Sequence, residues 1–181
     1  MKAGNLKKGA DIAPAKGKLG ILIAGIGGAV STTFMAGVEL VRRGLAEPVG
    51  SLTQLGTIRL GKRFEKRSPK ISEFVPLAGL DDLVFGGWDI YEANCYEAAL
   101  YARVLRRDHL DAVKDFLSSI SPMKAVFDRR FVKNLDGAHV KEAPGLRGKL
   151  EEIKEDIAEF KARNGVERCV VIWCGSTEVH L

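Results

Sequence analysis

The chain has 181 residues, about the length of one domain and enough to bury a hydrophobic core. Hydrophobic residues make up 46% of it and charged residues 28%, which excludes disordered, collagen-like and low-complexity chains. The three cysteines, Cys95, Cys169 and Cys174, are too few and too scattered for a disulfide framework or a paired-cysteine zinc site. We therefore expect a folded domain in a reducing compartment, without a structural metal.

The net charge of +5 is concentrated near the N-terminus, where five lysines and one aspartate lie within residues 1–18. We expect residues 1–17 to form a mobile basic tail and residues 18–181 to form the domain. A second basic run extends from Arg59 to Lys70, but it contains one aromatic residue and no recognisable nucleic-acid-binding module. We interpret it as a solvated loop, with a phosphate or nucleic-acid patch as the alternative.

Residues 19–38 carry no charge and follow two lysines, so their length resembles that of a membrane span. Five glycines interrupt the stretch, and Ser31, Thr32 and Thr33 place a polar cluster at its centre. The uninterrupted apolar part is shorter than the roughly 20 residues that a span requires. We therefore expect no membrane partner and no nucleic acid partner.

The first elements are predicted to be a strand, a glycine turn and a helix. Residues 18–24 form an apolar run rich in isoleucine that ends at a glycine, which is typical of a buried strand. Residues 32–43 follow with Phe34, Val38 and Val41 at helical spacing, Met35 and Leu40 alongside them, and two arginines at the end.

The later elements continue this alternation. Alternating strands and helices predict a parallel sheet with right-handed crossovers, and therefore an α/β, Rossmann-like fold with helices on both faces. The middle segments expected are a strand with a loop at 49–60, a strand at 82–88, a helix at 92–107, a helix at 109–117 capped by Asp108, a strand at 125–127 and a loop at 137–148. A helix is then expected at 149–163, with an apolar stripe of Leu150, Ile153, Ile157 and Phe160 and an end at Asn164 and Gly165. The last segment expected is a strand at 166–174 that is covered on both faces.

The glycine turn lies where the pyrophosphate of a dinucleotide would meet free N–H groups and the positive end of a helix. Gly25 would permit the tight turn, and Gly27 would permit close approach of the phosphates. Val30 occupies the position of the third glycine of G-x-G-x-x-G, so a simple turn is the alternative. About 20 residues on, where a ribose-binding acid is expected, only Glu47 is near, and it precedes a proline.

The turn is one of four motifs that occur in a fixed order. Gly25, Gly27 and Gly28 match the form G-x-G-G-x-x-G, with Ser31 in place of the last glycine. The other motifs are G-S-x-T-Q within residues 50–61, V-F-x-G-W-D-I at 83–90 and V-x-x-L-W-x-x-x-T-E at 170–178. In this order and spacing, over residues 18–181, the four motifs resemble the inositol-3-phosphate synthase family, also called myo-inositol-1-phosphate synthase.

The resemblance implies an enzyme that isomerises D-glucose 6-phosphate to 1D-myo-inositol 3-phosphate with NAD, for inositol and phospholipid biosynthesis, as a cytoplasmic homotetramer. In this family NAD takes a hydride from C5 of the opened sugar, an intramolecular aldol closure follows, and the hydride returns. The family continues past the last motif, and its catalytic lysines, sugar-phosphate site and tetramer-forming sheet belong to that part. The chain therefore resembles an amino-terminal, NAD-binding portion that is inactive alone, with its catalytic residues beyond Leu181.

The resemblance also implies which residues contact NAD. Asp89 and Thr177 match the family in identity, whereas residues 29–30 replace asparagines and residues 174–176 differ from the usual eukaryotic T-A-N. The implied contacts are Gly25, Gly27, Gly28, Ala29, Val30, Asp89, Cys174, Gly175, Ser176 and Thr177.

Other roles for these residues stay open. Asp89 is placed to cap the following helix, Cys174 is the kind of small residue that is buried at a strand end, and Trp88 and Trp173 are expected in the core. His139 lies in the loop where the family has cofactor contacts and is a weaker candidate. A generic NAD-dependent dehydrogenase domain and a non-enzymatic nucleotide-binding module are the alternative functions.

Overall fold

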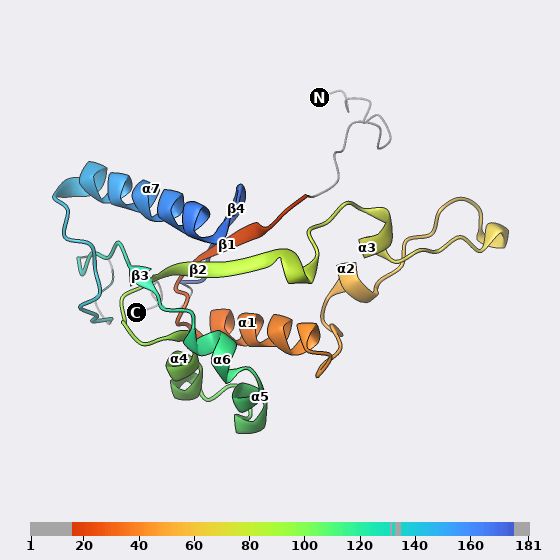
Figure 1. The fold of residues 1–181 in the computed structure, drawn as a ribbon, viewed down its shortest axis with the longest axis horizontal. Helices are drawn as coiled ribbons and strands as arrows, with labels where there is room; N and C mark the ends of the chain where they lie inside the picture. The colour runs from red at the N-terminus through yellow and green to blue at the C-terminus, as the bar shows by residue number, and fades with distance from the viewer. Residues whose placement is uncertain (1–15, 131, 133–134, 176–181) are drawn as a thin grey trace. The chain divides into compact units, whose positions relative to one another are not determined.

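The structure, a computed structural model, describes residues 16–130, 132 and 135–175 and divides into two units. The larger unit, built from residues 17–47 and the described residues after 79, contains a four-stranded sheet (Figure 1). Its elements are β1 (Leu19–Ala24), α1 (Ala29–Arg42), the 3-10 helix η2 (Leu80–Asp82), β2 (Leu83–Asp89), α4 (Cys95–Ala102), α5 (Arg107–Ala112), α6 (Lys114–Ser118), β3 (Met123–Lys124), α7 (Gly145–Asn164) and β4 (Arg168–Trp173).

The strand order is β3-β2-β1-β4, and every neighbouring pair is parallel. This is the order of the first four strands of the doubly wound dinucleotide-binding sheet. All six residues of β1 pair with β2 on one side and with β4 on the other, so that Ala24 lies between Trp88 and Trp173. The predicted Rossmann-like α/β fold is confirmed.

Helices cover both faces of this sheet (Figure 1). Ile21 and Ile23 of β1 belong to a core cluster with residues of α1, α4, α5 and α6. Leu22, between them in the sequence, belongs to a second cluster with Phe160 of α7. Because successive side chains of a strand point to opposite faces, this single strand contributes to both clusters.

α7 approaches the sheet closely through Phe160, which is 2% exposed. A Cβ atom at Gly20 of β1 would lie 2.8 Å from the Phe160 ring, and one at Gly86 of β2 would lie 2.6 Å from it. Two neighbouring strands therefore carry glycine where the ring lies, and any larger residue at either position would push α7 away from the sheet.

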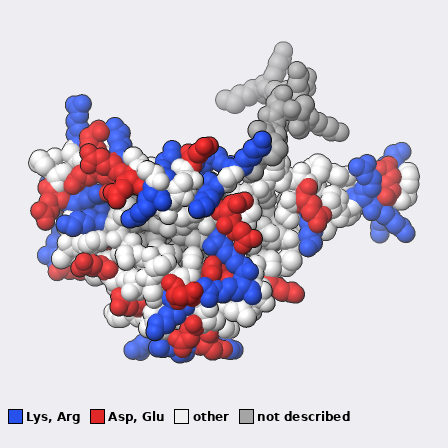
Figure 2. All heavy atoms as spheres, in the orientation of Figure 1, with Lys and Arg blue, Asp and Glu red and all other residues white. Residues whose placement is uncertain are grey.

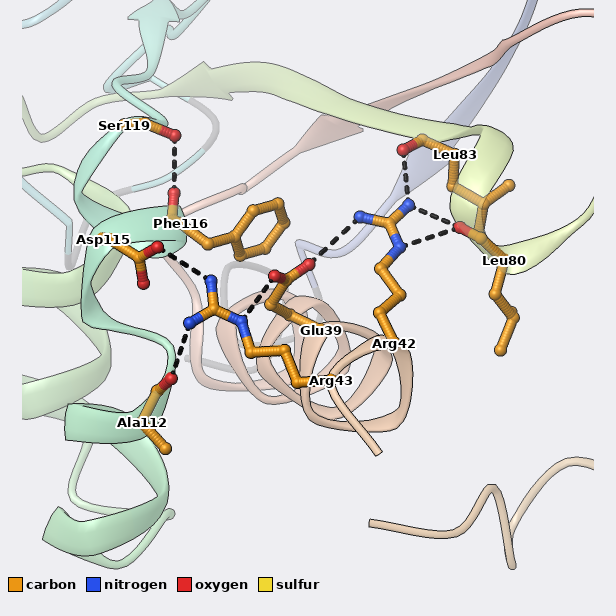
Figure 3. A network of polar contacts seen from close by, with 9 residues as sticks. All are labelled: Glu39, Arg42, Arg43, Leu80, Leu83, Ala112, Asp115, Phe116 and Ser119. Carbon is orange, nitrogen blue, oxygen red and sulfur yellow. Dashed lines mark hydrogen bonds and ion pairs between the residues drawn. The ribbon is translucent and has the colours of Figure 1, made fainter. Parts of the chain in front are cut away.

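The C-terminal end of α1 is fixed by two arginines (Figure 3). Arg42 Nε donates to the Leu80 carbonyl at 2.9 Å, and its Nη2 donates to the Leu83 carbonyl at 2.6 Å, at the start of β2. Arg43 pairs with Asp115 of α6 at 2.9 Å, and its guanidinium lowers the pKa of that carboxyl. Both arginines also pair with Glu39, so α1 is tied to β2 and to α6.

The buried face of α1 differs in part from the predicted one: Met35 and Leu40 are buried and Val38 packs against the core, but the helix start and Phe34 differ. The helix begins at Ala29 rather than at residue 32, and Phe34 lies at its margin, partly exposed and edge-on to Phe85. The polar first turn is buried instead, because its hydroxyls bond to carbonyls of the preceding turn. The buried residues are Ser31, Thr32, Met35, Ala36 and Leu40.

Several predicted helix limits are wrong. The helix expected at 92–107 is shorter, because Asn94 caps α4 and Arg103 ends it in the left-handed region at φ 54°. The helix expected at 109–117 is two helices that meet at Val113 (φ −124°), and Asp108 lies inside α5 rather than at its cap. The last helix begins at residue 145, inside the expected loop, and ends before Gly165 (φ 62°) as predicted.

Two predicted strands also differ. β3 is Met123–Lys124 rather than residues 125–127, although Ala125 forms a bridge with Val140. β4 is an edge strand of the described sheet and is not covered on both faces, so Val171 and Trp173 are exposed, the latter 73%. Trp173 is therefore not a core residue, whereas Trp88 is, as expected.

Among the described residues, the smaller unit contains Lys16 and residues 48–79. The strand predicted at 49–60 is wrong, because a short helix begins at Leu52 and only Thr57 forms a bridge, with Lys70. Leu52 and Leu55 have helical spacing, and no strand of the described sheet includes this segment. The elements of the unit are α2 (Leu52–Leu55), the 3-10 helix η1 (Arg63–Glu65) and α3 (Ile71–Phe74).

The uncharged stretch at residues 19–38 forms β1, the glycine turn and the first part of α1. Within the described residues, no helix combines the length and the apolar character needed to cross a bilayer.

We predict that Phe160→Ala lowers the free energy of unfolding by about 3–5 kcal/mol, because the lost ring leaves a cavity between α7 and the two glycines. The matched control is Leu150→Ala on the same helix, where the side chain is 53% exposed and the loss should stay below about 1 kcal/mol. Urea denaturation followed by circular dichroism measures both. Equal losses in the two variants would contradict the packing described here.

A second prediction concerns Cys95, which is buried at the start of α4. Burial, assisted by the negative charge of Asp89, raises the pKa of its thiol from 9.0 to about 12. The folded state therefore holds the thiol proton more tightly than the unfolded state does. The stabilisation from this group is fully present below pH 9 and is lost as the pH rises from 9 towards 12.

At pH 8.5, iodoacetamide should alkylate the half-buried Cys174 at least about a hundredfold faster than Cys95, since the thiolate is the reactive form. Mass spectrometry of peptides from the native chain measures both rates, and the urea-unfolded chain is the control in which the rates converge. Similar rates in the native chain would show that Cys95 is accessible.

Candidate cofactor site

The turn between β1 and α1 is built from glycine because its backbone needs it. Gly25 has φ 84°, in the left-handed region, and a Cβ there would lie 2.9 Å from the Cys174 carbonyl oxygen. The N–H groups of Gly25 and Ile26 both donate to the Trp88 carbonyl, at 2.8 and 3.2 Å. The last residues of β2 and the residue after β4 therefore border this turn, and a side chain at Gly25 would push the end of β4 away.

The first turn of α1 presents unpaired N–H groups. Gly28 is the N-cap residue and provides no side-chain cap, and the first turn contains no acidic residue. The hydroxyls of Ser31 and Thr32 do not compensate, because they donate backwards to the carbonyls of Gly25 (2.7 Å) and Gly28 (3.0 Å). These bonds stiffen the turn and leave the positive helix end available to an anion.

Val30 shows why the third glycine is dispensable here. In G-x-G-x-x-G that glycine permits close packing of helix against strand. The Val30 side chain is 66% exposed, whereas Ser31 and Thr32 beside it are buried and make the close contact. The substitution therefore leaves the geometry of the turn intact.

Asp89 ends β2 beside the turn. Its Oδ2 accepts a hydrogen bond from the Gly27 N–H at 2.9 Å, and its Oδ1 accepts one from the Tyr91 N–H at 3.1 Å. A Cβ at Gly27 would lie 3.1 Å from Oδ2, so this glycine permits the contact. Each carboxylate oxygen has a second lone pair, and the carboxylate can therefore accept further bonds from a hydroxyl pair.

Asp89 does not cap the following helix, although its place in the sequence is compatible with that role. The cap is Asn94, whose Oδ1 accepts from the N–H groups of Tyr96 and Glu97, each at 3.0 Å. Glu97 completes a capping box by accepting from the Asn94 N–H at 3.1 Å.

Asp89 occupies the position of the ribose-binding acid, for which the spacing of about 20 residues in the sequence offered only Glu47. In the doubly wound fold this acid ends the second strand, usually about 20 residues after the glycine turn. Here the second strand is β2, and residues 48–79 separate it from α1. The spacing rule therefore pointed to Glu47, whereas the topology points to Asp89.

A cavity of about 580 Å³ lies at this edge of the sheet. It brings together six of the ten predicted contact residues, from three separate parts of the sequence. They are Gly25, Gly27, Gly28, Ala29, Asp89 and Cys174.

The other predicted contact residues have different positions. Val30 is exposed on the first turn of α1, and Gly175 is buried with its nitrogen 3.9 Å from the Cβ position at Gly25. Ser176 and Thr177 lie outside the described residues. Cys174 is half-buried, and its N–H donates to the Ala24 carbonyl at 2.9 Å.

His139 supports the backbone beside the cavity rather than lining it. Its Nδ1 lies 3.1 Å from the Asp89 carbonyl, which can only accept, so this nitrogen carries the proton. Its backbone N–H donates to the Ile90 carbonyl at 3.0 Å. The histidine therefore fixes the chain as it leaves β2.

α4 contributes cavity residues that the sequence analysis missed. Glu97 and Tyr101 are four residues apart, as are Ala98 and Ala102, so one face of the helix lines the cavity. Helical spacing directly after the second strand was the signal that could have identified them.

These features fit NAD. The free N–H groups of α1 match a pyrophosphate, the Asp89 carboxylate matches a ribose diol, and the cavity has the size of a cofactor pocket. The glycine turn permits the close approach that phosphates require, since a side chain at Gly25 would meet the Cys174 carbonyl and one at Gly27 would meet the Asp89 carboxylate. The residues that could hold the cofactor thus come from the ends of β1, β2 and β4.

Comparison with known proteins supports this interpretation. Inositol-3-phosphate synthase 1 of Bacteroides thetaiotaomicron is 48% identical over 171 residues, which cover 94% of this chain and 39% of that protein. Inositol-3-phosphate synthase 1 of Oryza sativa subsp. japonica is 34% identical over 176 residues, which cover 89% of this chain and 34% of that protein. The chain thus spans about two fifths or less of the length of these relatives.

A solved structure agrees. The crystal structure of inositol-3-phosphate synthase from Caenorhabditis elegans superposes with a TM-score of 0.78 at 25% identity, covering 89% of this chain and 35% of that one. The sequence model of an NAD-binding family, described as myo-inositol-1-phosphate synthase, matches residues 19–181. With the glycine turn, Asp89 and the strand order, this match shows that the chain belongs to the NAD-binding domain family of myo-inositol-1-phosphate synthase.

Proposed function

We propose that this chain supplies the NAD-binding part of an inositol-3-phosphate synthase, an enzyme that isomerises D-glucose 6-phosphate to 1D-myo-inositol 3-phosphate. The main observation behind the proposal is the hydrogen bond between the glycine turn and Asp89, at the edge of the sheet where β1, β2 and β4 end. The 48% identity to a synthase supports this enzyme over a generic dehydrogenase domain.

The residues of this chain would hold NAD at three points. The free backbone N–H groups of Ala29 and Val30 would bind the pyrophosphate at the start of α1, beside Gly28, whose own N–H donates to the Gly25 carbonyl at 3.1 Å. Asp89 would accept bonds from a ribose diol while it keeps the Gly27 N–H in place. Cys174 and Gly175, and by family resemblance Ser176 and Thr177, would border the cofactor at the end of β4.

When bound, NAD supplies reversible hydride acceptance at a sugar carbon, which acidifies the neighbouring C–H. The described residues serve this chemistry by binding and orientation. No three of the described His, Cys, Asp and Glu side chains form a metal site, and no described basic side chain lines the cavity. We assign proton transfer, enolate stabilisation and sugar-phosphate binding to the part of the synthases that this chain does not span.

The context of the activity is part of the same proposal. By resemblance to the family, the whole protein would be a cytoplasmic homotetramer that serves inositol and phospholipid biosynthesis. The outer edge of β4 is unpaired in the described sheet, and unpaired strand edges are normally covered. This edge therefore supports the presence of further chain or of a neighbouring subunit beside β4.

NAD binding tests the site. The 181-residue chain should bind NAD in calorimetric titration, and Gly27→Leu should abolish the binding, because the side chain would enter the cradle and displace Asp89. The matched control is Gly37→Leu in α1, where a Cβ would meet no atom within 4 Å. Unchanged affinity in a folded Gly27→Leu variant would remove the turn from the site.

Activity tests the assignment of catalytic groups. The chain alone, incubated with glucose 6-phosphate and NAD, should form no inositol phosphate, since the groups that bind the sugar phosphate and stabilise the enolate would be missing. An assay for released inositol phosphate measures this, with a full-length synthase as the positive control. Clear turnover would place the catalytic groups within these 181 residues.

A further inference from the structure

Residues 57–70 of the smaller unit form an antiparallel hairpin. Thr57 pairs with Lys70, the Ile58 N–H donates to the Pro69 carbonyl at 3.0 Å, and the Leu60 N–H donates to the Arg67 carbonyl at 2.9 Å. Residues 61–66 make the turn, which includes η1. We call residues 61–67 the hairpin tip.

The hairpin is strongly basic, and Figure 2 shows Lys and Arg side chains around an acidic one at the far end of the segment drawn yellow in Figure 1. Its only acid, Glu65, lies with its carboxylate against the Gly61 backbone, inside the turn. Within the described chain none of the six cations forms an ion pair. The cations are Arg59, Lys62, Arg63, Lys66, Arg67 and Lys70.

An aromatic ring lies among these charges. Phe64 is 77% exposed at the hairpin tip, and the Lys62 ammonium lies 5.8 Å from its ring centroid. A large apolar side chain in water is costly to leave exposed, and the flanking cations favour a partner surface of negative charge. The tip thus combines an apolar anchor with positive charge on both sides.

The pairing register of the hairpin determines on which face each cation lies. Paired residues of a hairpin share a face, so Arg59 and Lys70 lie on one face and Arg67 lies on the other, with Ile58. No single face carries all the cations. They converge on one surface only if the hairpin approaches that surface with its tip.

We propose that the hairpin tip docks on a membrane surface rich in anionic lipid headgroups, with Phe64 entering the interface and the cations contacting phosphates and carboxylates. A fluid headgroup layer can surround a tip that is charged on both faces and can take up the exposed Phe64 ring, whereas a nucleic acid duplex offers phosphates but no apolar layer for the ring. Interfacial binding of this kind combines an apolar anchor with basic residues. It is independent of NAD binding.

The experiment is co-sedimentation of the 181-residue chain with vesicles of phosphatidylcholine, with and without about 30% phosphatidylserine. The chain should bind the anionic vesicles and not the neutral ones. The variant Lys62→Gln, Arg63→Gln, Lys66→Gln, Arg67→Gln should lower the partition coefficient at least about tenfold, and Phe64→Ala about fivefold.

The matched control removes four cations of α7, as Arg147→Gln, Lys149→Gln, Lys154→Gln and Lys161→Gln, with folding of every variant checked by circular dichroism. An equal loss in this control would overturn the proposal, because net charge alone would then explain the binding. Equal binding of Phe64→Ala and the parent chain would also overturn it, as would tip-dependent binding to a DNA duplex without binding to anionic vesicles.

Discussion

The hydrogen bond between the Gly27 N–H and the Asp89 carboxylate joins two parts of the chain that are 62 residues apart, and the cofactor site depends on it. It acts with the two bonds from Gly25 and Ile26 to the Trp88 carbonyl, so the end of β2 fixes the turn after β1. A turn held from the neighbouring strand keeps its backbone shape without a ligand. The N–H groups of α1 are therefore oriented before a phosphate arrives, which reduces the entropic cost of binding.

The fold was predictable from the sequence where local patterns coincide with long-range packing. β1 and β2 were predicted almost to their limits because each is a short apolar run beside a glycine or an aspartate. The exit of α7 at Gly165 followed from glycine's access to positive φ. In contrast, the break at Val113 and the short β3 depend on how α6 and the loop at residue 140 pack, which no local pattern records.

The site was predictable in part for the same reason. Its glycines were found from the turn and Asp89 from the family resemblance, but the geometric role of Asp89 was hidden by the inserted residues 48–79. The error at Trp173 has a different cause. A continuous apolar strand indicates burial on both faces, but β4 is an edge strand of the described sheet: Ile172 packs against one core cluster, whereas Val170, Val171 and Trp173 stay exposed.

The central place of β1 in the sheet also has a consequence for synthesis on the ribosome. Leu19 of β1 pairs with Arg168 of β4, so the first strand of the described sheet has one neighbour that is synthesised about 150 residues later. At about 5–20 residues per second, the apolar β1 waits about 7 to 30 seconds for that neighbour. Such non-local pairing slows folding because the loop must close before the contacts form. The nascent chain is thus exposed to aggregation for that interval, and β1 is the segment a chaperone would protect.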